Sequence, residues 1–172
     1  MAGSEQRSAP RSFVWGGTAP LALIVVLLTI AVDQLHKWWM LSVYDIETKG
    51  RVVVAPFLDL VFVKNIGISY SMFNQESATG QYLLVGFAVA ASLALWLWLN
   101  RSGGSRLMAL SLGLIIGGAL GNAIDRLRLG GVADFFSFHA YGFHWYVFNI
   151  ADVAIVAGVI GLLYESFRGE SH

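Results

Sequence analysis

The sequence contains four apolar segments that are each long enough to cross a lipid bilayer as a helix. A helix rises about 1.5 Å per residue, so about 20 apolar residues cover a hydrocarbon core of about 30 Å. The segments cover residues 19–40, 81–99, 107–124 and 147–164. Only 13% of the residues are charged, which is too few for the surface of a soluble domain of this size. We therefore predict one membrane domain, over residues 1–172, with four transmembrane helices.

The first segment has an alternative interpretation as a cleavable signal peptide. Arg7 and Arg11 precede it, as basic residues precede the apolar part of such peptides. No small-x-small cleavage site follows, however, and the helical pattern continues through Asp33 to Lys37. We therefore predict that the segment is kept as a membrane span.

Four spans place both termini on one side of the membrane, but the number of basic residues does not fix which side. The connection 100–106 is purely basic, whereas the loop 41–80 also carries four acidic residues. This difference favours cytoplasmic termini, with the loops 41–80 and 125–146 on the periplasmic side.

Both of these loops contain segments that are typical of β-strands. Residues 57–63, 132–138 and 143–148 are rich in aromatic and β-branched residues, and glycines separate the last two from their neighbours. The fold class predicted is thus a membrane all-α protein with a small periplasmic antiparallel sheet. We also expect a short surface helix over Ser69–Gln81.

Polar and charged side chains gather at one end of the predicted spans, where they are costly unless they serve a function or a buried pair. They are Asp33, Lys37, Asn122, Asp125, Arg126, Asn149 and Asp152, with Asp134 from the loop between the last two spans. A glycine stripe at residues 113, 117 and 121 allows close helix packing, which we expect to bring Asp152 near the region of Asp125.

Each carboxylate also has an ordinary structural explanation. Asp33 and Lys37 are four residues apart and form a natural intrahelical ion pair, and Asp125 has arginines beside it. Asp134 and Asp152 have no adjacent basic residue, so a helix cap or a hydrogen-bonded structural role is their alternative. Burial raises the pKa of such carboxyls, and two close carboxyls share one proton.

A pair of this kind suits peptide hydrolysis. One carboxylate takes a proton from water, while its protonated partner polarises the scissile carbonyl and later protonates the leaving amine. Such a pair needs no metal and no nucleophilic side chain. We therefore favour an aspartic endopeptidase, which acts at the outer membrane face.

Other functions fit the residues less well. The chain has no cysteine, no HExxH segment for zinc and no glycine-flanked serine elbow of the G-x-S-x-G type. Its net charge of zero gives no reason to expect a nucleic-acid partner. A four-helix transporter or channel with a path lined by Asp and Asn is the main alternative. A membrane interaction module is another, and it would tolerate loss of both aspartates.

Five short motifs resemble the bacterial lipoprotein signal peptidases, also called type II signal peptidases. They occur in the order of that family and spread over most of the chain. The motifs are Asp33-Gln34-x-x-Lys37, Asn65-x-Gly67, Gly117-Gly-Ala-Leu-Gly-Asn122-x-x-Asp125-Arg126, Gly130-x-Val-x-Asp134-Phe135 and Phe148-Asn149-x-Ala-Asp152.

The resemblance implies a function and roles for these residues. The family removes signal peptides from diacylglyceryl-modified prolipoproteins in the inner membrane, cutting on the amino side of the lipidated cysteine. It makes Asp134 and Asp152 the catalytic pair. Asn65, Gly67, Asn122, Arg126 and Asn149 would bind the substrate, with Asp33, Lys37 and Asp125 in support. We expect a monomer that contacts membrane lipids and needs no cofactor or metal.

Two departures from the family pattern are visible. Asn65-Ile-Gly67-Ile-Ser-Tyr stands where Asn-Thr-Gly-Ala-Ala-Phe is common, which affects the expected substrate contacts, and Tyr146-Val147 replaces a frequent proline. Neither change touches the two aspartates. We choose Asp134 over Asp125 as the catalytic partner because Arg126 is expected to keep Asp125 ionised and occupied.

Overall fold

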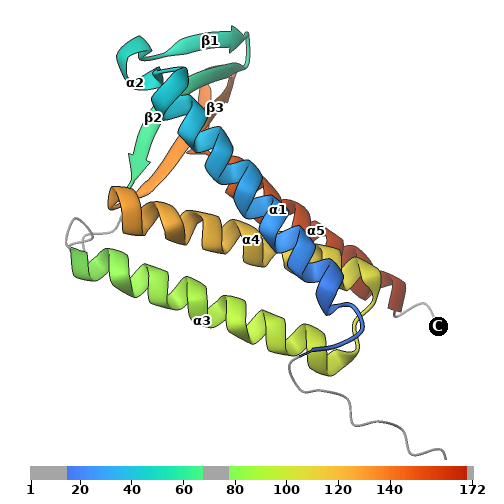
Figure 1. Cartoon of the computed structure of the whole chain (residues 1–172). Helices are drawn as coiled ribbons and strands as arrows, with labels where there is room; N and C mark the ends of the chain where they lie inside the picture. The colour runs from blue at the N-terminus through green and yellow to red at the C-terminus, as the bar shows by residue number, and fades with distance from the viewer. Residues whose placement is uncertain (1–14, 68–77, 170–172) are drawn as a thin grey trace, which may run out of the picture.

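The computed structural model describes residues 15–67 and 78–169 and consists of a helical bundle with a small sheet at one end (Figure 1). The four long helices are α1 (Ala19–Trp38), α3 (Ala78–Ser102), α4 (Arg106–Leu129) and α5 (Ile150–Gly169). All four are long and apolar enough to span a membrane. The prediction of four membrane helices is therefore confirmed.

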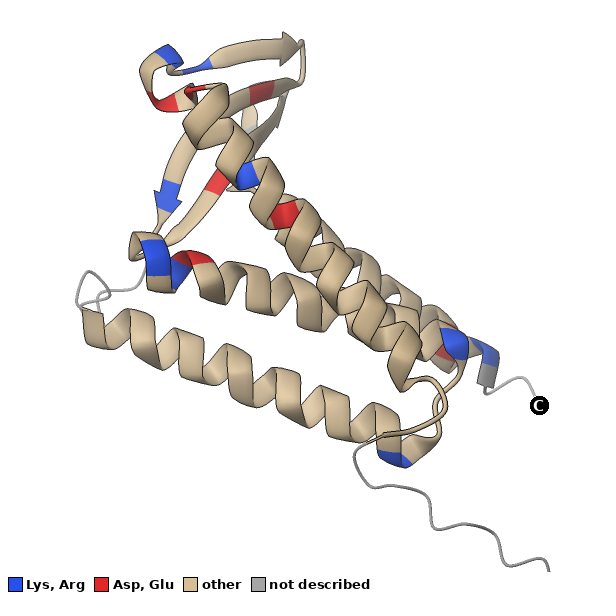
Figure 2. Ribbon diagram, in the orientation of Figure 1, with Lys and Arg blue, Asp and Glu red and all other residues tan. Residues whose placement is uncertain are grey.

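Helix α4 is the central helix of the bundle. It packs against α1, α3 and α5. Of the residues in its apolar segment 56% are buried, whereas at most 28% are buried in the apolar segment of each of the other three helices. The outward faces of the other helices are covered by exposed leucine, valine and phenylalanine side chains, as expected where lipid is the solvent. Charged residues lie mainly toward the helix ends and in the sheet (Figure 2).

Close packing of α4 depends on glycines, but the predicted stripe faces a different partner. A Cβ at Gly117 would lie 2.6 Å from the Thr29 Cβ, and one at Gly113 would lie 2.8 Å from Val25, so this stripe packs on α1. Asp152 does lie near the Asp125 region, since Asn122 donates to it at 2.9 Å, but the stripe is not what brings them together. Gly118 makes the approach to α5, where its Cβ would lie 2.5 Å from the carbonyl oxygen of Ala151.

A four-stranded antiparallel sheet in the order β1-β2-β3-β4 lies beyond the helix ends (Figure 1). The strands are β1 (Val52–Ala55), β2 (Leu58–Asn65), β3 (Val132–Ala140) and β4 (Phe143–Phe148). A buried cluster around Met40, Ile46 and Phe135 joins the sheet to the end of α1. The antiparallel sheet was predicted correctly, although β1 was missed.

The boundaries of several elements differ from the sequence-based ranges. Helix α1 continues into a short π-helix, η1 (Trp39–Val43), which is followed by a turn of helix, α2 (Ile46–Lys49). The last span was predicted from residue 147, but strand β4 continues to Phe148 and α5 begins at Ile150. Residues 69–77 of the predicted surface helix lie outside the described residues, and residues 78–81 belong to α3.

Candidate active site

Asn149 is the residue on which the predicted site converges. It lies between β4 and α5, and it exchanges two hydrogen bonds with Asp152 in the first turn of α5. The Asp152 backbone N–H donates to Asn149 Oδ1 at 3.0 Å, and the Asn149 N–H donates to Asp152 Oδ2 at 3.1 Å. This reciprocal pairing has the logic of a capping box and fixes the Asp152 carboxylate at the start of the helix.

The same Asn149 side chain also reaches Asp134 on β3. Its Nδ2 donates to Asp134 Oδ1 at 2.6 Å and to Asn122 Oδ1 at 3.1 Å. Asn122 Nδ2 in turn donates to Asp152 Oδ1 at 2.9 Å. Two asparagines thus hold Asp134 and Asp152 on the same side of the bundle, although the residues come from a strand and a helix.

Asp134 is buried, with 2% of its surface exposed, and accepts its hydrogen bonds from the neutral amides of Asn65 and Asn149. Asn65 Nδ2 on β2 donates to its Oδ2 at 3.1 Å, because β2 and β3 pair with Asn65 opposite Val132. The pKa of Asp134 is raised to about 6, mainly by burial and in addition by the negative charge of Asp152, while the amide hydrogen bonds from Asn65 and Asn149 and the charge of Lys37 oppose the rise. This carboxyl therefore keeps its proton up to about pH 6, well above the range of an ordinary aspartate.

Lys37 on α1 is the cation of the site and is fully engaged with its neighbours. Its Nζ lies 2.9 Å from Asp33 Oδ2 and 2.7 Å from Asp125 Oδ2, and it donates to Asn122 Oδ1 at 3.1 Å. Both the lysine and its two carboxylates are buried. An ammonium group has three donors, so these contacts use its hydrogen-bonding capacity completely.

Asp125 is occupied, but by partners other than the expected arginines. Lys37 binds its Oδ2, the backbone N–H of Ala133 donates to the same oxygen at 3.1 Å, and Gln34 Nε2 donates to its Oδ1 at 2.8 Å. The expectation that Arg126 holds Asp125 was wrong, because Arg126 Nη1 donates instead to the backbone carbonyl of Asn122. Asp125 therefore anchors the start of β3 to α1 and α4.

Gln34 was not selected as a site residue from the sequence, although it belongs to one of the motifs. Its amide bridges Asp33, the carbonyl of Gly121 and Asp125, and it accepts a hydrogen bond from Arg128 at 3.2 Å. A glutamine on an apolar span is itself a signal of buried hydrogen bonding.

The remaining predicted residues lie at the edge of this cluster. Gly67 has φ of 122°, and its N–H donates to Asn65 Oδ1 at 3.1 Å, which orients the Asn65 amide toward Asp134. Arg126 Nε is buried and has no hydrogen-bond partner among residues 15–67 and 78–169. In the same described ranges, no three His, Asp or Glu side chains are grouped as metal ligands.

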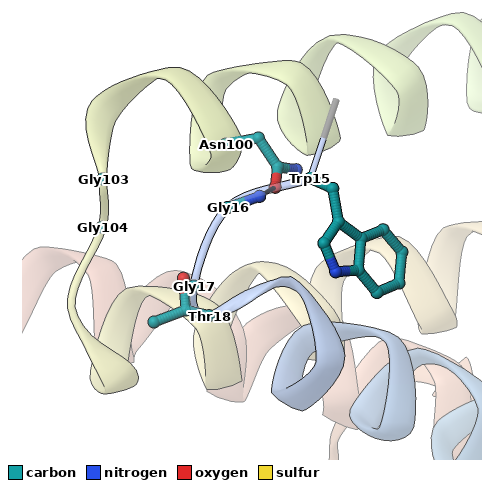
Figure 3. A pocket seen from close by; sticks show the side chains of 7 residues that line it. All are labelled: Trp15, Gly16, Gly17, Thr18, Asn100, Gly103 and Gly104. Atoms are coloured by element: carbon teal, nitrogen blue, oxygen red, sulfur yellow. Dashed lines mark hydrogen bonds between the residues drawn. The ribbon is translucent and has the colours of Figure 1, made fainter. Parts of the chain in front are cut away.

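Two cavities differ in their relation to this cluster. One, of about 500 Å³, has Asp152 in its wall and is otherwise lined by Phe138, Tyr146, Phe148, Val153 and Val156. The other, of about 240 Å³, lies at the opposite end of the bundle, where the Asn100 side chain points at the backbone of Gly16 and the Trp15 ring points away from it (Figure 3). No acidic or basic side chain lines the second cavity, so only the first one combines space with a carboxylate.

Comparisons with known proteins point to one family. The family model described as signal peptidase II matches residues 25–168. A lipoprotein signal peptidase of Methylocella silvestris is 53% identical over 146 residues, with 85% of each chain covered. One of Beijerinckia indica is 50% identical over 147 residues, covering 86% of this chain and 87% of the relative.

The fold is also similar to two solved structures of a bacterial membrane enzyme. They superpose with TM-scores of 0.70 and 0.72 at 23% sequence identity. The first superposition covers 88% of this chain and 90% of the solved one, and the second covers 85% and 92%. At this identity the likeness establishes the fold alone.

Proposed function

The chain belongs to the family of lipoprotein signal peptidases, membrane enzymes that remove signal peptides from lipoproteins, and from this premise we propose that Asp134 and Asp152 are its catalytic pair. Membership of the family confirms the prediction of a multi-pass membrane peptidase over the channel and interaction-module alternatives. The observation that carries the proposal is that both carboxylates are hydrogen-bonded to Asn149.

The surroundings of the two aspartates support different roles for them. Asp134 is buried and its pKa is raised to about 6, so it holds the proton and hydrogen-bonds the scissile carbonyl oxygen. Asp152 lines the cavity of about 500 Å³ and removes a proton from the attacking water. The water oxygen then bonds to the carbonyl carbon, and the pair passes a proton to the amine as the carbon–nitrogen bond breaks.

The lysine network supports this pair from behind. Asp33 Oδ1 accepts a hydrogen bond from the Ala151 N–H at 3.0 Å, so α1 holds the residue next to Asp152. Lys37 fixes the Asn122 carbonyl, which leaves the Asn122 amide to donate to Asp152. We therefore assign Asp33, Lys37 and Asp125 as positioning residues.

The residues at the edge of the cluster are proposed to bind the peptide. Arg126 has a buried Nε donor without a hydrogen-bond partner in the described part of the chain, which suits a substrate carbonyl. The other proposed binding residues are near the two aspartates, and their amides can hydrogen-bond either the site or the substrate backbone. They are Asn65, Gly67, Asn122 and Asn149.

The finer features of the substrate and the location complete the proposal. The substrate is a prolipoprotein whose cysteine carries diacylglycerol, cut on the amino side of that cysteine. The enzyme is a monomer surrounded by lipid in the inner membrane, with both termini cytoplasmic and the sheet on the periplasmic side. The purely basic connection between α3 and α4 supports this orientation.

The proposal is tested by cleavage of a synthetic diacylglyceryl prolipoprotein by purified variants. Asp134→Asn and Asp152→Asn, each checked for folding, are expected to lose turnover by at least about 10³-fold, whereas Asp59→Asn, a buried aspartate in the sheet, retains turnover. Full turnover by Asp134→Asn together with its loss in Asp125→Asn would move the pair to Asp125.

A further inference from the structure

An aromatic trough leads away from Asp152 along the sheet. Its larger part is the cavity of about 500 Å³ that is lined by Phe138, Tyr146, Phe148 and α5. Its smaller part, of about 270 Å³, lies around Phe57 and Phe143 and shares Phe138 with the first. We propose that this trough seats an acyl chain of the diacylglyceryl group on the substrate cysteine, an inference that rests on the proposed function.

The walls of the trough suit a hydrocarbon chain better than a peptide. Apart from Asp152, the larger part is lined only by aromatic side chains and by Val153 and Val156. A polypeptide placed here would leave its backbone N–H and C=O groups without partners, which is costly, whereas an acyl chain has no such groups. Both parts have volumes within or near the range of sites for small ligands.

The trough is also preformed. Phe138 stacks on Phe57 at 6.2 Å between ring centroids and on Phe148 at 5.5 Å. Phe138 is therefore held in place by rings on both sides while 41% of its surface remains exposed. An exposed aromatic surface that is fixed before binding needs little ordering when a chain enters.

The trough is continuous with the lipid-facing side of α5. Val153 and Val156 line it and are themselves exposed, and the exposed face continues along α5 through Val159 and Ile160. A chain in the bilayer can thus enter sideways without crossing water. Because the acyl chain moves from one apolar medium to another, the trough adds little binding energy and acts mainly by positioning the substrate. It places the thioether of the cysteine, and the scissile peptide bond next to it, against Asp152.

A second apolar groove of about 370 Å³ provides the competing location. It lies between α1 and α5, where Val25, Leu28 and Val32 line one wall. It shares Val153 with the trough but does not include Asp152. A chain in that groove would hold the cysteine without directing it along the sheet.

The test compares two lipobox peptides that differ only in the acyl chains, dipalmitoylglyceryl and dibutyrylglyceryl, in bilayer nanodiscs. Val156→Trp narrows the trough and is expected to lower kcat/KM about tenfold more on the dipalmitoyl substrate than on the dibutyryl one. Val159→Trp, on the same exposed face but outside the trough, is the matched control and is expected to change neither.

Equal losses on both substrates, or no loss on either, would overturn the inference. A photoreactive acyl chain gives a second readout: adducts on Tyr146 or Val156 support the trough, and adducts confined to Val25, Leu28 or Val32 refute it. Neither result depends on the assignment of the catalytic pair. That assignment fails separately, if the aspartate variants turn over normally.

Discussion

Replacing Asp134 with asparagine should make the protein more stable relative to the wild type as the pH rises. The pKa of this carboxyl is 3.8 when unperturbed and about 6 in the fold, where burial is the main cause. The folded state therefore binds the proton more tightly than the unfolded state. Stability is highest below pH 4 for this group and is lost as the pH rises from about 4 to about 6.

The size of the effect follows from the two pKa values. Each pKa unit corresponds to about 1.4 kcal/mol, so the full cost of ionising Asp134 is about 3 kcal/mol. About 2 kcal/mol of this falls between pH 4 and pH 7. Asparagine carries no charge but turns an amide toward Asn65 or Asn149, which costs about 1–3 kcal/mol at every pH. The pH dependence is therefore the informative quantity.

Reversible unfolding in mixed micelles measures this difference. The free energy of unfolding of Asp134→Asn minus that of the wild type should rise by about 2 kcal/mol from pH 4 to pH 7. Ser137→Ala, on the same strand but without a titrating group, should show a constant difference. A flat difference for Asp134→Asn would show that the carboxyl is not held in its neutral form by burial.

Three further changes test the parts around Asp134. Lys37→Met leaves two buried carboxylates without their cation and should cost about 3–5 kcal/mol of unfolding free energy, measured in the same micelles. Gly117→Val places side-chain atoms inside α1 and should abolish the folded form in gel filtration, whereas Gly86→Val, with nothing within 4 Å, should fold normally. Asn65→Leu removes an amide that lowers the pKa of Asp134, so the pH above which kcat/KM falls should move from near 6 to a higher value. An unchanged pH profile would show that Asn65 does not influence the protonation of Asp134.

The membrane helices could be predicted because length and apolarity alone decide whether a segment spans lipid. The strands β2, β3 and β4 were also visible from their aromatic and β-branched residues, since pleated surfaces favour these side chains. Strand β1 was missed because Val52–Ala55 is short and gains its hydrogen bonds only from pairing with β2. Such pairing is a property of register rather than of local sequence.

The sequence predicted which residues belong to the site but not which of them contact one another. The spacing Asn149-x-x-Asp152 predicts a local pair at any helix start, and the structure has this pair. The link from Lys37 to Asp125 joins residues of two helices, and the bond from Asn65 to Asp134 depends on how β2 and β3 align. Neither follows from spacing along one chain, so neighbouring arginines were wrongly chosen as partners of Asp125.

The central claim, that Asp134 holds a proton beside Asp152, is tested most directly by infrared titration of the carboxylic C=O band. The wild type should lose one such band as the pH rises through about 6. The band should be absent in Asp134→Asn, and in Asp152→Asn it should titrate at lower pH because a neighbouring negative charge is gone. A band near pH 6 that persists in Asp134→Asn would contradict the claim.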